Sequence, residues 1–494
     1  MGESTTKPIY TAFLDEALSR AESLFSYIDK KIKPQMFLVS VISTPDFGQR
    51  VSLFTKGDTW ISEADFAEYT KVFEKIFADA QSGKKKSLRK INSQALDLKK
   101  ICMRESVFKI FESAEKKPAG LSFFISEAAT VEDEDFFVVL AVGSDDLDKY
   151  PSIEVSASDS DIYLSPSFMA SLIDEFLEKH RIELDMHAAD FLSSGFHFGL
   201  DSIIQQAGRN FVGDIAYRVS GKPQPSWNEH IFSVCTEISR THYELAEACG
   251  SIMLAPKDVV IEPHAVRFSA NPKLGDVRST RKLLELTKDG MALHSDSETI
   301  FGLCRPPKRL SKSYIRFDIE FLGKHKWQIS YLGKPLITVS YGIPRPPSSP
   351  FEAAEFADAL KKVFGFKSPR KIERLVEIIQ VAMREKKGTL LVFSKKAKEE
   401  AKRLSSQSTL IAPIALNKQL LLSLTPIDGA LMIDQNGICY SIGTILDGMV
   451  TQNGDSGRGA RYNSAVKYID YRKALGETCM AVVVSEDANV DIVT

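Results

Sequence analysis

The sequence lacks both an excess of one charge and long apolar runs. Its 494 residues carry 63 Lys and Arg against 65 Asp and Glu, a formal net charge of -2. No overall positive field therefore attracts DNA or an anionic membrane. We find no run of about 18 apolar residues and no apolar stretch after the amino terminus that resembles a signal peptide. These absences predict a cytoplasmic protein with neither DNA nor a membrane among its partners.

Paired cysteines and clustered histidines are also missing. The six cysteines are scattered and form no C-x-x-C pair, so we expect reduced core residues rather than zinc ligands. None of the eight histidines follows His325, so chemistry in the last third of the chain must proceed without imidazole. The phosphate-binding motif G-x-x-x-x-G-K-[ST] is absent as well.

The length and the pattern of apolar residues predict about three α/β domains. Four prolines within Gly342–Pro350 predict an extended linker that interrupts helix and strand alike. Before the linker, helical and strand-like segments alternate, and we expect an N-terminal α/β domain, a candidate sensor, over residues 1–195. A second domain is expected over 196–350 and a third over 351–494.

The third domain is expected to be a sandwich of helices on a mixed sheet. The predicted helices are 351–363, 372–386, 396–404, 417–424 and 463–474. The predicted strands are 388–393, 429–433, 438–442 and 480–485. The segment Gln435-Asn436-Gly437 is typical of a hairpin turn between the second and third of these strands.

The middle and carboxy-terminal parts of the chain resemble each other. In both, a strand beginning near a glycine (Gly250, Gly388) is followed by a helical segment, an Asp-Gly turn and a second strand. Asp289 lies 39 residues after Gly250, and Asp428 lies 40 residues after Gly388. We favour a duplication over chance similarity, with residues 196–350 as the degenerate copy.

The segment from Asn453 to Lys467 is rich in glycine, arginine and hydroxyl groups just before a helix. Free N–H groups at a helix start and nearby guanidinium groups bind phosphates. An ordinary flexible loop with a helix cap is the alternative interpretation.

Two acidic positions are candidates for metal chemistry. Asp428 follows Thr425-Pro426 and precedes two small residues that allow a ligand to approach the backbone. Such a carboxylate can bind a divalent metal and help to deprotonate a ribose hydroxyl, although an ordinary Asp-Gly turn explains it equally well. Glu486 and Asp487 end the last long strand, where a further metal ligand could sit.

Taken in order, these segments resemble the diadenylate cyclase family over roughly residues 370–494. Its catalytic domain has Asp-Gly-Ala after a Thr-Pro-containing loop, then Gly-x-Arg-His-Arg, then a strand ending in Val-Ser-Glu. This chain has Thr425-Pro-Ile-Asp-Gly-Ala430, Gly459-Ala-Arg-Tyr-Asn-Ser464 and Val482-Val-Val-Ser-Glu-Asp487.

The resemblance implies condensation of two ATP molecules into the second messenger cyclic di-AMP, with release of two pyrophosphates. It implies dependence on Mg²⁺ or Mn²⁺ and a homo-oligomer, since two domains must face each other to close the ring. Asp428 and Arg461 would be catalytic, and Asp428, Glu486 and Asp487 would bind the metal. The implied nucleotide-binding residues are Gly429, Ala430, Leu446, Gly459, Ala460, Arg461, Tyr462, Asn463, Ser464 and Ser485.

One motif departs from the family pattern, because Arg-His-Arg is replaced by Arg461-Tyr462-Asn463. This change removes one cation and one imidazole from the triphosphate site, for which Arg458 and Lys467 are the available substitutes. Three functions stay open: an active diadenylate cyclase, a cyclase that makes a different cyclic dinucleotide, and an inactive nucleotide-binding sensor or interaction protein.

The first 350 residues are expected to be regulatory by analogy. The copy around Asp289 either binds a nucleotide without turning it over or only packs against the cyclase domain.

Overall fold

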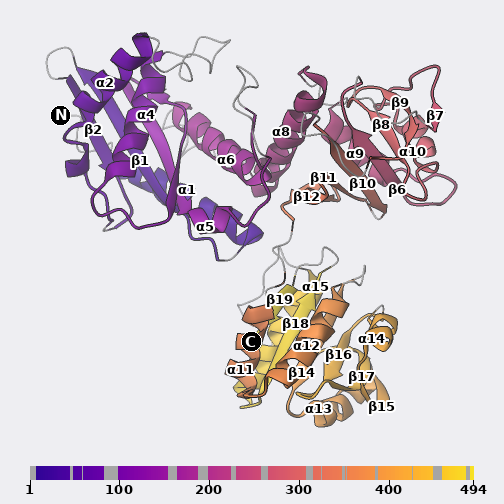
Figure 1. Cartoon of the computed structure of the whole chain (residues 1–494). Coiled ribbons are helices and arrows are strands. Elements are labelled where there is room, and N and C mark those ends of the chain that lie inside the picture. The colour runs from indigo at the N-terminus through magenta and orange to yellow at the C-terminus, as the bar shows by residue number, and fades with distance from the viewer. Residues whose placement is uncertain are drawn as a thin grey trace. The chain divides into compact units, whose positions relative to one another are not determined.

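The computed structural model forms two compact units, Met1–Pro347 and Ser348–Thr494, which we call the amino-terminal and carboxy-terminal units (Figure 1). The residues that the structure describes are 7–29, 31–44, 48–57, 59–82, 98–153, 164–186, 199–223, 230–257, 265–307, 315–323, 325–347, 351, 353–383, 388–425, 427–448, 459–485 and 490–494. The expected boundary at residue 195 and the last three residues of the predicted linker lie outside these ranges.

The first sheet of the amino-terminal unit is antiparallel and has helices on both faces. Its strands are β1 (Gln35–Thr44), β2 (Gly48–Phe54), β3 (Leu121–Ile125), β4 (Ala129–Val131) and β5 (Glu134–Gly143), in the order β2-β1-β5-β3 with β4 also on β5. Alternate residues of β1 and β5 face opposite sides, so Phe37 and Phe137 pack with α2 (Tyr69–Gln81) and α4 (Leu98–Ser113). Leu38 packs on the other face with α1 (Lys7–Ile28) and α6 (Phe168–Asp185). The short elements η1 (Glu63–Phe66) and α5 (Ser144–Leu147) complete this region.

The second sheet of this unit is mixed. Its strands are β6 (Cys249–Leu254), β7 (Val266–Arg267), β8 (Ala292–Ser295), β9 (Ile300–Cys304), β10 (Phe317–Gly323), β11 (Lys326–Tyr331), β12 (Lys334–Ser340) and β13 (Ile343–Arg345), in the order β13-β12-β11-β10-β6-β8-β9-β7. Three helices accompany it: α8 (Leu200–Ser220), α9 (Ile231–Arg240) and α10 (Val277–Leu284).

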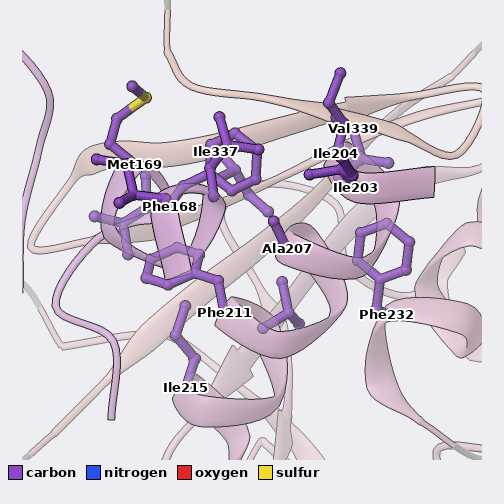
Figure 2. Packing of buried hydrophobic residues seen from close by; sticks show 14 of the residues in the cluster. Phe168, Met169, Ile203, Ile204, Ala207, Phe211, Ile215, Phe232, Ile337 and Val339 are labelled. Atoms are coloured by element: carbon purple, nitrogen blue, oxygen red, sulfur yellow. The ribbon is translucent and has the colours of Figure 1, made fainter. Parts of the chain in front are cut away.

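One hydrophobic cluster connects the two sheets. It extends from helix α1 to strand β12, and the helices α6 and α8 contribute its middle part. Figure 2 shows this packing, with Phe168 of α6, Phe211 of α8 and Phe232 of α9 beside Ile337 and Val339 of β12. Continuous burial of apolar surface across both sheets explains why residues up to 347 form one unit.

The predicted linker is partly wrong. Residues Ile343–Arg345 form strand β13, which pairs with β12, and Pro344 lies opposite Val339. Proline is tolerated there because β13 is the edge strand of the sheet. No further strand lies on its open side, so an N–H group missing on that side breaks no hydrogen bond between strands. Arg345 donates a 2.8 Å hydrogen bond from Nε to the hydroxyl of Tyr27 in α1. The amino-terminal unit therefore extends to the middle of the proline-rich segment.

A buried histidine in α6 makes the stability of this unit depend on pH. His180 is 1% exposed; its Nδ1 lies 2.8 Å from the carbonyl oxygen of Phe176, and its Nε2 has no partner among the described residues. Burial, reinforced by the charge of Arg20, lowers the pKa of His180 from 6.5 to about 4. The neutral ring is therefore the form that the fold accommodates.

We expect His180 by itself to cost this unit about 3 kcal/mol of unfolding free energy as the pH falls from 6.5 to about 4, because unfolding lets His180 take up a proton. Urea denaturation at several pH values measures the loss. His180→Leu should make the profile shallower by about this amount, leaving the part due to His230, whose pKa is also lowered to about 4. His242→Gln, at an exposed position, should leave the profile unchanged, and an equally steep profile in His180→Leu would contradict the assignment.

The carboxy-terminal unit is a three-layer sandwich. Its strands are β14 (Thr389–Ser394), β15 (Thr409–Ala415), β16 (Ala430–Ile433), β17 (Ile438–Thr444), β18 (Cys479–Val484) and β19 (Val490–Val493), in the order β15-β17-β16-β14-β18-β19. Its helices are α11 (Ala353–Phe364), α12 (Pro369–Ala382), α13 (Ala397–Arg403), α14 (Lys418–Leu424) and α15 (Ala460–Ala474), with a short η2 (Ser405–Gln407). Leu391 faces the layer of α11, α12 and α14, whereas Leu390 faces α13 and α15.

The structure confirms the expected α/β class with mixed sheets and the hairpin turn at Gly437, whose φ is +78°. The N–H of Gly437 donates to the carbonyl of Asp434 at 3.0 Å. Strands β15 and β19 had not been expected, and α15 begins at Ala460 rather than at Asn463. Among the described residues, no helix is long and apolar enough to cross a membrane.

The predicted repeat is confirmed at the level of topology. The order β7-β9-β8-β6-β10-β11 matches β15-β17-β16-β14-β18-β19, with β6–β8 and β14–β16 parallel and every other neighbouring pair antiparallel. Asp289-Gly290 precedes β8 as Asp428-Gly429 precedes β16. In the part of the chain described between β6 and β11, α10 is the only helix.

Candidate active site

The fold brings together the two residues that were expected to be catalytic. Asp428 lies between the end of α14 and the start of β16, and Arg461 lies in the first turn of α15. Nη2 of Arg461 is 3.6 Å from Oδ1 of Asp428. The Asp428 side chain is 95% exposed and that of Arg461 is 34% exposed, so the pair adds little stability and both groups remain accessible to a ligand.

Gly429 holds Asp428 close to the end of β17. Its φ is +100°, and a Cβ at this position would lie 2.6 Å from the carbonyl carbon and 2.8 Å from the carbonyl oxygen of Gly443. Only glycine tolerates both the backbone angle and this close approach. Ala430, the next residue, is buried and pairs with Leu390 and Thr444.

The described part of the segment expected to bind phosphate, residues 459–467, forms the beginning of helix α15. Gly459 is the N-cap of α15 and has no side chain with which to cap the helix, and the first turn contains no acidic residue. Ala460, Arg461, Tyr462, Asn463 and Ser464 all belong to the helix. The positive end of the dipole of a 15-residue helix and its first N–H groups bind anions. The expected phosphate-binding chemistry is therefore retained, although the local structure is a helix start rather than a loop. Arg458, expected as a substitute cation, lies outside the described residues, whereas Lys467 lies in the helix.

Two of the expected nucleotide-binding residues pack on one face of the sheet. Leu446 and Tyr462 are partly buried against the cluster that contains Ala430 and residues of α13 and α15. They provide an apolar surface beside the Asp428–Arg461 pair, of the kind that holds a nucleotide base.

The strand ends place Ser485 at the same edge of the sheet as Asp428. Val484 pairs with Thr389, and the next residue of β14, Leu390, pairs with Ala430. Ser485 follows Val484 directly, but Glu486 and Asp487 lie outside the described residues. Within the described ranges, no group of three His, Cys, Asp or Glu residues forms a metal site. The exposed carboxylate of Asp428 suits a divalent cation as a single ligand.

A buried charged cluster behind the site was not recognised in the sequence. Glu400 of α13 is 3% exposed and accepts hydrogen bonds from Tyr468 (2.8 Å), Arg472 (2.5 Å) and Arg403 (2.9 and 3.0 Å). Arg403 also binds Asp447. The spacing of Glu400 and Arg403, three residues apart, is a signal for a helical ion pair, but the partners from α15 are distant in sequence.

We propose that Arg461 binds a phosphate of ATP, and we expect Arg461→Ala to weaken ATP binding at least about tenfold, because a charge-assisted bond to phosphate would be lost. Isothermal titration with a non-hydrolysable ATP analogue measures the dissociation constant. The matched control is Arg370→Ala, at an exposed position in the first turn of α12, which should bind as the unchanged protein does. Equal dissociation constants for the two variants would show that Arg461 does not bind phosphate.

Comparisons with known proteins match the amino-terminal unit to two sensor-domain models. No curated protein matches the chain. Among solved structures, the chain is similar to a double mutant of DacA from Staphylococcus aureus (18% identity, 25% of this chain and 81% of that chain, TM-score 0.21). It is also similar to a hypothetical membrane spanning protein from Bacillus cereus (19% identity, 28% of this chain and 71% of that chain, TM-score 0.21). Residues 11–212 match the family model "Probable sensor domain DACNG", and residues 229–333 match "Probable sensor domain DACNH".

Proposed function

We propose that the carboxy-terminal unit is a diadenylate cyclase that condenses two ATP molecules into cyclic di-AMP and two pyrophosphates, and that residues 1–350 control it. The observation that carries the proposal is the convergence of Asp428, Gly429 and the start of α15 at one edge of the sheet. The two sensor-domain models support it, because such domains belong to diadenylate cyclase-like proteins.

In this mechanism, the 3′-oxygen of one ATP attacks the α-phosphorus of the other. The new bond joins this oxygen to phosphorus, the bond to the bridging α–β oxygen breaks, and pyrophosphate leaves. Asp428 accepts the hydroxyl proton, and Arg461 with the N–H groups of α15 holds the phosphates. Bound Mg²⁺ or Mn²⁺ would neutralise phosphate charge, with Asp428, Glu486 and Asp487 as the proposed ligands. A second round with the roles exchanged closes the ring.

Product analysis separates the three functions left open by Tyr462 and Asn463. The full chain is incubated with ATP, GTP or both, in Mg²⁺ or Mn²⁺, and the products are identified by mass spectrometry. Cyclic di-AMP supports the proposal, and a guanine-containing cyclic dinucleotide indicates a changed base preference. Binding of ATP without release of pyrophosphate indicates a nucleotide-binding sensor instead.

Ring closure requires two copies of the site to face each other, and the site has an apolar rim suited to this contact. Ile427, which directly precedes Asp428, and Ile445, which directly follows β17, are 45% and 63% exposed. Paired apolar surface of this kind stabilises self-association. We therefore propose a homo-oligomer that buries this rim.

Ile445→Asp should weaken self-association and reduce turnover most strongly at low protein concentration, because a charge is placed in the contact. Sedimentation velocity and turnover over a concentration series measure both effects. Leu475→Asp is the matched control, since Leu475 is 55% exposed at the opposite end of α15. If both variants associate as the unchanged protein does, the contact lies elsewhere.

A further inference from the structure

The charged cluster behind the site links the two segments that would hold the nucleotide. Arg403, the last residue of α13, is bonded to Glu400 and also to Asp447, through Nη2 at 2.8 Å and Nη1 at 2.5 Å. Asp447 directly follows Leu446, the residue expected to contact the base. Arg403 therefore connects this short segment to a carboxylate buried in the domain.

The same buried carboxylate holds helix α15. Tyr468 and Arg472 donate to Glu400 from positions seven and eleven residues after Arg461. Seven residues are close to two helical turns, so Tyr468 lies on the same side of α15 as Arg461. Arg472 also donates from Nε to Glu477 at 2.8 Å. This second bond restricts the position of the Arg472 side chain.

The segment Ile445–Gly448 is attached at three points. The N–H of Ile445 donates to the carbonyl of Gln407 at 3.1 Å, and Asp447 binds Arg403. A Cβ at Gly448 would lie 2.7 Å from the carbonyl carbon of Lys467 in α15, so the backbones touch. The hydrogen bonds of Arg403 hold the pKa of Asp447 below its usual range, as expected for a carboxylate that binds a guanidinium group.

We propose that Arg403 and Asp447 are positioning residues that fix Leu446 relative to the phosphate-binding start of α15, and so set the affinity of the site for ATP. This inference rests on the proposed function of the carboxy-terminal unit. The pair touches no reacting atom, so its loss acts on substrate binding rather than on the chemical step. Although the Arg403 and Asp447 side chains are 35% and 37% exposed, their two parallel hydrogen bonds give the bidentate geometry in which an arginine–carboxylate bond is strong enough to hold a segment.

The test compares Asp447→Asn with the unchanged full chain. The amide retains the shape but loses the charge, so the dissociation constant for a non-hydrolysable ATP analogue and KM should each rise about tenfold, whereas kcat should change less than about threefold. Hydrogen exchange at residues 445–448 should accelerate, and Asp447→Glu should restore part of the affinity. Lys361→Ala breaks a more exposed pair with Asp358 in α11 of the same unit and should change none of these quantities.

The outcomes separate this inference from the proposed function. Unchanged hydrogen exchange or an unchanged dissociation constant in Asp447→Asn overturns the positioning role, even if the protein makes cyclic di-AMP. A fall in kcat with constant KM overturns it as well. If the unchanged protein makes no cyclic product but Asp447→Asn still weakens analogue binding, the proposed reaction fails and the positioning role stands; if the unchanged protein binds no ATP, both fail.

Discussion

Asp428→Asn is expected to reduce formation of cyclic dinucleotide between about a hundredfold and ten-thousandfold, the range typical for loss of a general base. The amide accepts no proton from the ribose hydroxyl and binds a divalent cation less tightly than a carboxylate does. The fold should be unaffected, because the Asp428 side chain is 95% exposed and its ion pair with Arg461 is solvated. Quantifying product by mass spectrometry at saturating ATP measures the effect.

The control for this experiment is Asp358→Asn, an exposed aspartate in α11 of the same unit. It should retain full turnover, and both variants should keep the thermal midpoint of the unchanged protein, as surface substitutions usually do. Full turnover in Asp428→Asn would exclude this residue from the reaction. A lowered midpoint in that variant alone would instead indicate a structural role.

Gly429→Ala is expected to destabilise the carboxy-terminal unit by about 2 to 4 kcal/mol and to abolish turnover. The new Cβ would lie within 3 Å of three backbone atoms of Gly443 and Thr444, and backbone atoms of a paired strand cannot move away cheaply. Relief requires β16 and β17 to separate where Ala430 pairs with Thr444, which also displaces Asp428. Urea denaturation and product formation measure the two effects.

Gly476→Ala separates the steric clash from the backbone strain. Gly476 also has a left-handed φ, +76°, but a Cβ there would meet nothing within 4 Å. It should therefore cost only the strain, about 1 kcal/mol, and leave turnover intact. If the two variants lose similar amounts of unfolding free energy and turnover, the close approach of Gly429 to β17 is not what makes glycine necessary at this position.

Several parts of the fold could be predicted from the sequence because their causes are local. The apolar alternation, the turn at Gly437 and the helix that begins after Asn417 depend on residues within a few positions of one another. Asn417 caps α14 through its side chain, 2.9 Å from the N–H of Leu420. The repeated spacing of Gly250 with Asp289 and of Gly388 with Asp428 also predicted two sheets of one topology.

Other features depend on contacts that no local pattern contains. The start of α15 at Ala460 and the strand at Pro344 follow from packing on neighbouring strands and helices. This packing overrides the tendency of glycine and proline to interrupt helices and strands. The sequence indicated Asp428 and Arg461 separately, by residue type and by resemblance. Only the parallel pairing of β14 with β16 and the packing of α15 place them 3.6 Å apart.

The charged cluster shows this difference most clearly. Glu400, Asp447 and Arg472 are separated by up to 72 residues, and nothing in their local sequence indicates that they share one network. A buried carboxylate must be satisfied by donors, but which donors reach Glu400 depends on where α13 and α15 cross the sheet. The sequence by itself determined the types of element and the candidate chemistry, whereas tertiary packing decided which of these residues meet, because burial and hydrogen bonding act between segments that the chain brings together only when it folds.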